Sequence, residues 1–134
     1  THYNSEDFQF DISDNAKVTF ENNTATGSGG AIALHGLGYS NQIPVFQKNG
    51  ALSFINNSSG NDGGAINNGG NDRIIFQKND TISFEDNTAK GKGGAICANS
   101  SVGISFTENK LVSFTGNSSG SAGGAICASL LQIR

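Results

Sequence analysis

The chain has 134 residues, the length of one ordinary domain, and a formal net charge of −3. It has no basic field to hold nucleic acid or an anionic membrane, and no apolar run approaches the ~18 residues of a membrane-spanning helix. Glycine is abundant, at 19 residues, and tryptophan is absent. Such a composition would also fit disorder. However, seven of the nine phenylalanines open a Phe-x-x-Asn motif, and that order favours a folded, repetitive chain.

Two series of short strands alternate along the chain. The first series opens with Ile12 to Asn15 and continues with Phe-x-x-Asn motifs at Phe46 with Asn49, Phe76 with Asn79, and Phe106 with Asn109. The second series lies eight residues later, at Phe20 with Asn23, Phe54 with Asn57, Phe84 with Asn87, and Phe114 with Asn117. An apolar residue stands two positions before each of these phenylalanines. This alternation with period two predicts strands.

A glycine-rich motif completes each repeat. It reads Gly-Gly-Ala-Ile and occurs at Gly29, Gly30, Ala31 and Ile32; at Gly63, Gly64, Ala65 and Ile66; at Gly93, Gly94, Ala95 and Ile96; and at Gly123, Gly124, Ala125 and Ile126. The glycine pairs and the phenylalanines of the second series step together by 34, 30 and 30 residues. A fixed period in this range is typical of stacked repeat architectures.

Three short strands in each repeat predict an all-β, right-handed parallel β-helix, a solenoid of about four turns of ~30 residues. Residues 1–134 are expected to form a single segment of it. The phenylalanines are expected to form two inner ladders. The isoleucines of the glycine motif should also point inward, with the glycines leaving room beside the phenylalanines. The asparagines are expected to turn the corners in the left-handed conformation and to stack as amide ladders. Both motifs then chiefly build the fold.

Charged residues are expected on the outside of the solenoid. The residue before the first asparagine column reads Asp14, Lys48, Lys78 and Glu108. Opposite charges on neighbouring turns attract, but an exposed pair contributes only ~0–1 kcal/mol. The carboxylates Glu21, Glu85 and Asp86 are also expected at outer positions, and we assign no chemistry to them.

An insertion of four residues lies between Gly30 and Phe46. Residues 34–43 are expected to leave the solenoid as a protruding loop that carries His35 and Tyr39. A protruding loop with an aromatic side chain is a common contact surface. The alternative is an insertion that the fold merely tolerates.

Cys97 and Cys127 lie one repeat apart. In a parallel β-helix they would stack at about 4.8 Å, which is within the Cα range of a disulfide. With Ile96 and Ile126 inward, both thiols are expected to point outward. An oxidising extracellular setting would favour a disulfide or links to other chains. Two surface thiols are the alternative.

The sequence shows no constellation for catalysis. The two histidines, His2 and His35, are distant, and neither a metal-ligand spacing nor a phosphate-binding loop is present. We therefore expect no enzyme activity, no bound metal and no cofactor.

The paired Phe-x-x-Asn and Gly-Gly-Ala-Ile repeats resemble the passenger domains of the chlamydial polymorphic membrane proteins, over nearly the whole chain from Ile12 to Ala128. The resemblance implies a β-helical autotransporter passenger that acts as a host-cell adhesin, with both motifs linked to adhesion. It also implies a location at the bacterial cell surface or outer membrane, or secretion after processing. One departure from the pattern is Ile12, which replaces a phenylalanine. The chain is expected to be a fragment of a longer array whose parent is anchored by a barrel outside this chain.

The favoured function is adhesion to a host-cell surface protein through the outer faces of the solenoid and the protruding loop. The alternatives are a structural stalk and a glycan-binding or glycan-cleaving β-helix. No nucleic-acid partner is expected. Cutting a β-helix exposes unpaired strand edges, so self-association end to end is also expected.

Overall fold

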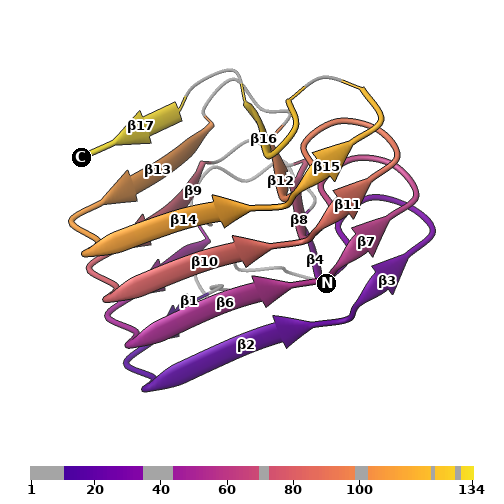
Figure 1. The fold of residues 1–134 in the computed structure, drawn as a ribbon. Helices are drawn as coiled ribbons and strands as arrows, with labels where there is room; N and C mark the ends of the chain where they lie inside the picture. Colours follow the sequence, from indigo (N-terminus) through magenta and orange to yellow (C-terminus); the bar gives the residue numbers. More distant parts are fainter. Residues whose placement is uncertain (1–10, 35–43, 70–72, 99–102, 122, 129–130) are drawn as a thin grey trace, which may run out of the picture.

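The computed structural model describes residues 11–34, 44–69, 73–98, 103–121, 123–128 and 131–134. These residues form a right-handed parallel β-helix, in which the chain winds round one axis and rises by one strand in each turn (Figure 1). Within the described ranges, no helix is long and apolar enough to cross a membrane. The expected fold class is confirmed.

Four parallel sheets run along the axis, and each is built from strands one turn apart. Sheet A contains β1 (Asp11–Ser13), β5 (Val45–Gln47), β9 (Ile74–Gln77), β13 (Ile104–Thr107) and β17 (Leu131–Ile133). Sheet B contains β2 (Lys17–Glu21), β6 (Ala51–Ile55), β10 (Thr81–Glu85) and β14 (Leu111–Thr115). Sheet C contains β3 (Thr24–Ala25), β7 (Ser58–Ser59), β11 (Thr88–Ala89) and β15 (Ser118–Ser119). Sheet D contains β4 (Ile32–Leu34), β8 (Ile66–Asn68), β12 (Ile96–Ala98) and β16 (Ile126–Ala128).

Two details of the expected architecture need correction. Each turn has four strands rather than three, because the two residues after each asparagine of the second series form the short strands of sheet C. Strands of two residues carry too little alternation to be recognised in the sequence. The number of turns is about three rather than four, because the four strands of sheets B, C and D are separated by three intervals in each sheet.

The phenylalanines form the two inner ladders that the sequence predicts. Phe54 and Phe84 stack with ring centroids 4.7 Å apart and planes 4° apart, and Phe46 and Phe76 stack at 4.7 Å and 9°. The two ladders meet edge to face, for example at 6.1 Å between Phe76 and Phe84. The rings of the inner turns are fully buried, whereas Phe20 and Phe114 are half-buried in the first and last turns of sheet B. Offset and edge-to-face aromatic packing therefore runs the length of the core.

The third inner column comes from sheet D, where Ile32, Ile66 and Ile96 are buried and Ile126 is half-buried. All four lie in register on neighbouring strands. The inward orientation of these isoleucines is confirmed.

Two columns of asparagine form continuous amide ladders along the axis. In the first column, successive Nδ2 atoms of Asn15, Asn49 and Asn79 donate to the Oδ1 atom of the next asparagine at 3.0–3.1 Å. The second column repeats this pattern from Asn23 to Asn117. Each Oδ1 also accepts the backbone N–H of the preceding asparagine in the column. The predicted ladders are confirmed.

The sequence also suggested that the asparagines themselves adopt the left-handed conformation at the corners, and this was wrong. The left-handed residue is the one before the asparagine. Positive φ angles of 52° to 67° occur at Asp14, Lys48, Lys78 and Glu108 in one column, and at Asn22, Asn56, Asp86 and Gly116 in the other. A left-handed L-residue costs roughly 1–2 kcal/mol. The following asparagine holds the bend in place with its side-chain hydrogen bonds, and these offset that cost.

The two glycines of each glycine motif have different roles. The first is left-handed, with φ between 65° and 73°. The second allows a close approach of backbone from the next turn. At Gly64, a Cβ atom would lie 2.7 Å from the backbone nitrogen of Thr88 and 2.8 Å from its oxygen. The second glycines of the first three motifs therefore clear space for the backbone of the next glycine motif and of sheet C, and not, as expected, for the phenylalanines.

Gly64→Ala is expected to destabilise the fold by ~1–3 kcal/mol, because overpacking a rigid backbone contact forces the two turns apart. Gly27→Ala is the matched control, since nothing lies within 4 Å of a Cβ atom at that position. Urea denaturation of both variants measures the difference. Equal midpoints would show that the turns can separate at no cost, contrary to this account of the motif.

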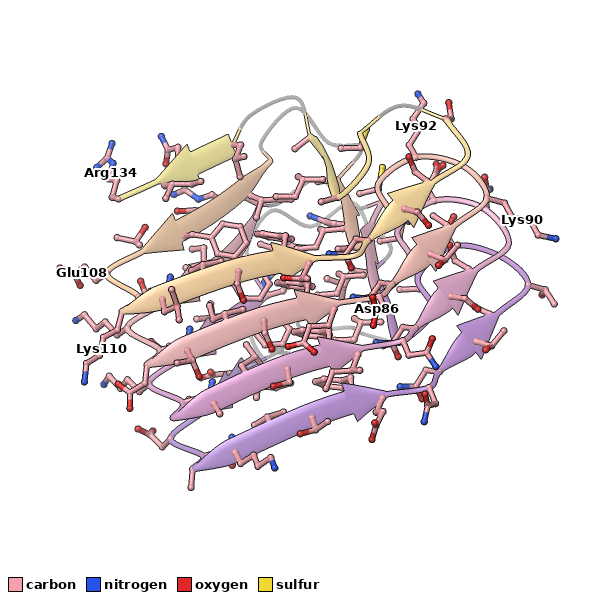
Figure 2. The ribbon with its side chains drawn as sticks, viewed as in Figure 1. Asp86, Lys90, Lys92, Glu108, Lys110 and Arg134 are labelled. Atoms are coloured by element: carbon pink, nitrogen blue, oxygen red, sulfur yellow. The ribbon has the colours of Figure 1, made fainter. Side chains whose placement is uncertain are left out.

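The corner between sheets A and B carries the charged pairs. Lys78 Nζ lies 4.0 Å from Glu108 Oε2, and Lys110 Nζ lies 3.1 Å from Asp80 Oδ1. Glu108 and Lys110 project from this edge beside Arg134 (Figure 2). The first pair is the attraction between neighbouring turns that the sequence predicts. All four side chains are more than half exposed, so these pairs add little to stability.

Candidate functional site

The residues of the two repeated motifs lie mainly inside the solenoid. Phe46, Phe54, Phe76, Phe84 and Phe106 are buried, as are Asn49, Asn57, Asn79 and Asn87. Gly63, Gly64, Gly93 and Gly94 are buried with the alanine and isoleucine that follow them. A side chain with no exposed surface cannot touch a partner. The motifs can therefore support recognition only through the surface that they hold in place.

A regular surface runs along the outer side of sheets B and C, and we call it the outer polar face. It consists of the outward side chains of the strands from β2 to β15 in those two sheets, which lie on the near side of Figure 1. Two columns of hydroxyl side chains run along it: Thr19, Ser53, Ser83 and Ser113; and Thr24, Ser58, Thr88 and Ser118. Threonine and serine columns on a flat parallel sheet present donors and acceptors at a regular spacing.

Hydrogen bonds between turns order this face. Ser83 Oγ donates to Ser53 Oγ at 3.3 Å, and Ser58 Oγ donates to Thr24 Oγ1 at 3.4 Å. At the corner between the two sheets, Asn56 Nδ2 donates to Asn22 Oδ1 at 2.7 Å. A surface that is ordered before binding loses less side-chain entropy when a partner binds.

Charge on the outer polar face is sparse and mostly negative. Glu21, Glu85 and Asp86 are exposed, as expected, and Lys17 lies at the start of the first strand. Asp86 follows β10, and Lys90 and Lys92 project from the loop after β11 (Figure 2). The hydroxyl columns repeat along this face, whereas the outward residues at the two ends of each sheet B strand differ from turn to turn: Lys17, Ala51, Thr81 and Leu111; and Glu21, Ile55, Glu85 and Thr115.

Cys97 and Cys127 are register partners on neighbouring strands of sheet D, and both are thiols. The structure corrects one expectation: Cys97 is fully buried rather than outward in solvent, whereas Cys127 is half-buried. Burial, together with the hydrogen bond to the Cys127 side chain, raises the pKa of Cys97 to about 12. The thiol is therefore protonated at neutral pH, and protonated thiols exchange with disulfides slowly.

A buried amide adjoins this pair. Asn67 is the register partner of Cys97 on the other side, and its Oδ1 atom accepts no hydrogen bond from any described residue. Sequence reasoning missed this atom, because only the tertiary structure covers the outer side of sheet D.

The described residues include no group of three or more histidine, cysteine, aspartate or glutamate side chains that could hold a metal ion. The predicted contact residues His35 and Tyr39 lie outside the described part of the chain. Sequence reasoning also missed sheet C, whose strands consist only of the two small residues that follow the asparagine in every repeat.

The comparisons agree with this architecture. The family model for the Chlamydia polymorphic membrane protein repeat matches residues 17–34, 45–69, 81–99 and 111–129. Three of these stretches begin with the strand of sheet B and continue through the glycine motif. No curated protein and no solved structure matches the chain. Because the family model covers more than half of its residues, the chain belongs to the Chlamydia polymorphic membrane protein repeat family.

Proposed function

We propose that this chain is part of an autotransporter passenger and acts at the bacterial surface as an adhesin for a host-cell surface protein. The observation that supports this most directly is the division between inside and outside. The repeated motif residues are mainly buried, and the outer polar face presents hydroxyl columns flanked by positions whose side chains differ from turn to turn. Recognition on such a fold takes place on the outer surface, where a regular array of hydroxyls and carboxylates can pair with a polar partner.

Multivalency strengthens contacts of this kind. Equivalent positions recur on strands one turn apart, so neighbouring turns can engage one partner at once. Linked weak contacts give an avidity well above that of a single contact. A longer array of the same repeats would bind more strongly without any new type of contact.

The test compares two variants with equal added charge on different faces. Thr81→Lys with Thr88→Lys places two cations on the outer polar face, where both side chains are exposed. Gln77→Lys with Thr107→Lys places two on the outer side of sheet A. Beads coated with each folded variant are counted on cultured host cells. We expect the first pair to reduce adhesion and the second to leave it unchanged.

If the chain is only a structural stalk, neither variant should reduce adhesion. If both variants keep their melting temperature and adhere like the unchanged chain, the outer polar face is passive and the solenoid is a spacer. Loss of adhesion in both variants to the same degree would indicate a charge effect with no defined site.

The insertion loop, residues 34–43, is the second proposed contact. Removing four residues from it restores the repeat of 30, so the shortened chain is expected to fold with the same melting temperature. Because the loop carries Tyr39, we expect this variant to bind cells less well in the bead assay. Tyr39→Ala in the full-length loop is the matched control for the aromatic contact. Unchanged adhesion in both folded variants would show that the insertion is merely tolerated.

Self-association is a further expectation for a sample of this chain. Among the described strands, β2, β3 and β4 have a neighbour on one side only, as do β14, β15 and β16. Leu131 and Ile133, which are 42% and 69% exposed, lie over the last turn of sheet A. Light scattering with and without a reductant should show concentration-dependent oligomers. Leu131→Lys with Ile133→Lys should reduce them, and a strict monomer at high concentration in both buffers would contradict the expectation.

A further inference from the structure

The two cysteines share one position on neighbouring turns. Cys97 in β12 and Cys127 in β16 are direct register partners, and their side chains are hydrogen-bonded to each other. Parallel strands are spaced at about 4.8 Å, so the two Cβ atoms leave the sheet side by side on the same face. The chain therefore presents two sulfur atoms that point along the same column.

The geometry points to a binding site for one soft, thiophilic monovalent cation, Cu(I) or Ag(I), held between the Cys97 and Cys127 sulfur atoms. A metal–thiolate bond is about 2.3 Å long, so two thiolates on one cation lie at most about 4.6 Å apart. The strand spacing of about 4.8 Å lies just above that limit, and a modest rotation of each side chain about χ1 brings the sulfurs within it without any movement of the backbone.

The donor set selects the class of metal. Cysteine thiolates are soft ligands and favour Cu(I) over hard cations. A structural zinc site needs four ligands, and no group of three or more histidine, cysteine or carboxylate side chains occurs among the described residues. Two thiols with no further strong ligand suit a cation of low coordination number.

The binding step balances in atoms and in charge. On binding, two S–H bonds break, two metal–sulfur bonds form, two protons pass to solvent, and no electron is transferred. The bis-thiolate complex carries one negative charge. Cys127 is half-buried, so the cation has a route to the pair from the surface.

The experiment titrates Cu(I) into the reduced chain under anaerobic conditions, in the presence of a coloured Cu(I) chelator as competitor. We expect the unchanged chain to take one equivalent from the chelator and to remain a monomer by size-exclusion chromatography at low concentration. Cys97→Ser and Cys127→Ser should each lose this uptake. Asn67→Ser is the matched control, because it alters the same column of sheet D and keeps both thiols.

A second probe needs no variant and therefore does not depend on how well the variants fold. Phenylarsine oxide bridges two neighbouring thiols with loss of one water, so mass spectrometry of the folded chain should show one phenylarsenic group. Retained Cu(I) uptake in either cysteine variant would overturn the proposal. Uptake only with dimer formation, or absence of both Cu(I) and arsenic from the folded chain, would do the same.

Discussion

Phe84→Ala is expected to lower the free energy of unfolding by ~3–5 kcal/mol, among the largest effects of any single substitution in this chain. Phe84 is fully buried and stacks on Phe54 and Phe114 at 4.7 Å and 4.8 Å, and it meets the edge of Phe76. Its removal leaves a cavity that the neighbouring turns cannot close, because the strands on both sides are held in register by hydrogen bonds.

Phe114→Ala is the matched control in the same ladder. Phe114 is half-buried and stacks on one ring of its own column, so less apolar surface and fewer contacts are lost. Phe10→Ala is also expected to be milder, although Phe10 lies outside the described residues. Thermal unfolding followed by circular dichroism measures all three. Equal melting temperatures for Phe84→Ala and Phe114→Ala would refute the ladder as a source of stability.

Asn87→Ala is expected to be nearly as damaging, at ~3 kcal/mol or more, because it leaves several buried polar groups without partners. Asn87 Oδ1 accepts from the backbone nitrogen and Nδ2 of Asn57 at 2.9 Å and 3.0 Å. Its Nδ2 donates to Phe54 O at 3.0 Å and to Asn117 Oδ1 at 2.9 Å. Alanine supplies none of these groups, and the corner interior is closed to water.

Asn56→Gly tests whether burial is the cause. Asn56 is exposed and makes one side-chain hydrogen bond, to Asn22. Glycine accepts its φ of 52° without strain, so this variant should lose well under 1 kcal/mol. Urea denaturation of both variants gives the comparison. If Asn87→Ala lowered the free energy of unfolding as little as Asn56→Gly, the amide ladder would not be a source of stability.

Periodicity made the overall architecture predictable from the sequence. Because the strands pair with their copies one turn along, the repeat of 30 residues sets the register of the inner turns, and the insertion lengthens the first step to 34. Alternation around Phe76 and Phe84 identified the inner side of sheets A and B, and the isoleucines identified that of sheet D. The stacking of Asn57 on Asn87 followed from the same period, since identical amides at one strand spacing can bond to each other.

Tertiary structure alone decided which residue bends the corner and which surface is covered. The left-handed residue is Lys78 rather than Asn79, because the asparagine side chain is needed for hydrogen bonds to the turns on either side. Gly64 is required by the backbone of Thr88, a contact between segments that no local pattern reveals. Cys97 lies between inward residues of β12, so the alternation predicts an exposed side chain, yet it is buried. Local sequence determines how a strand alternates, and the packing of neighbouring turns determines what covers its outer side.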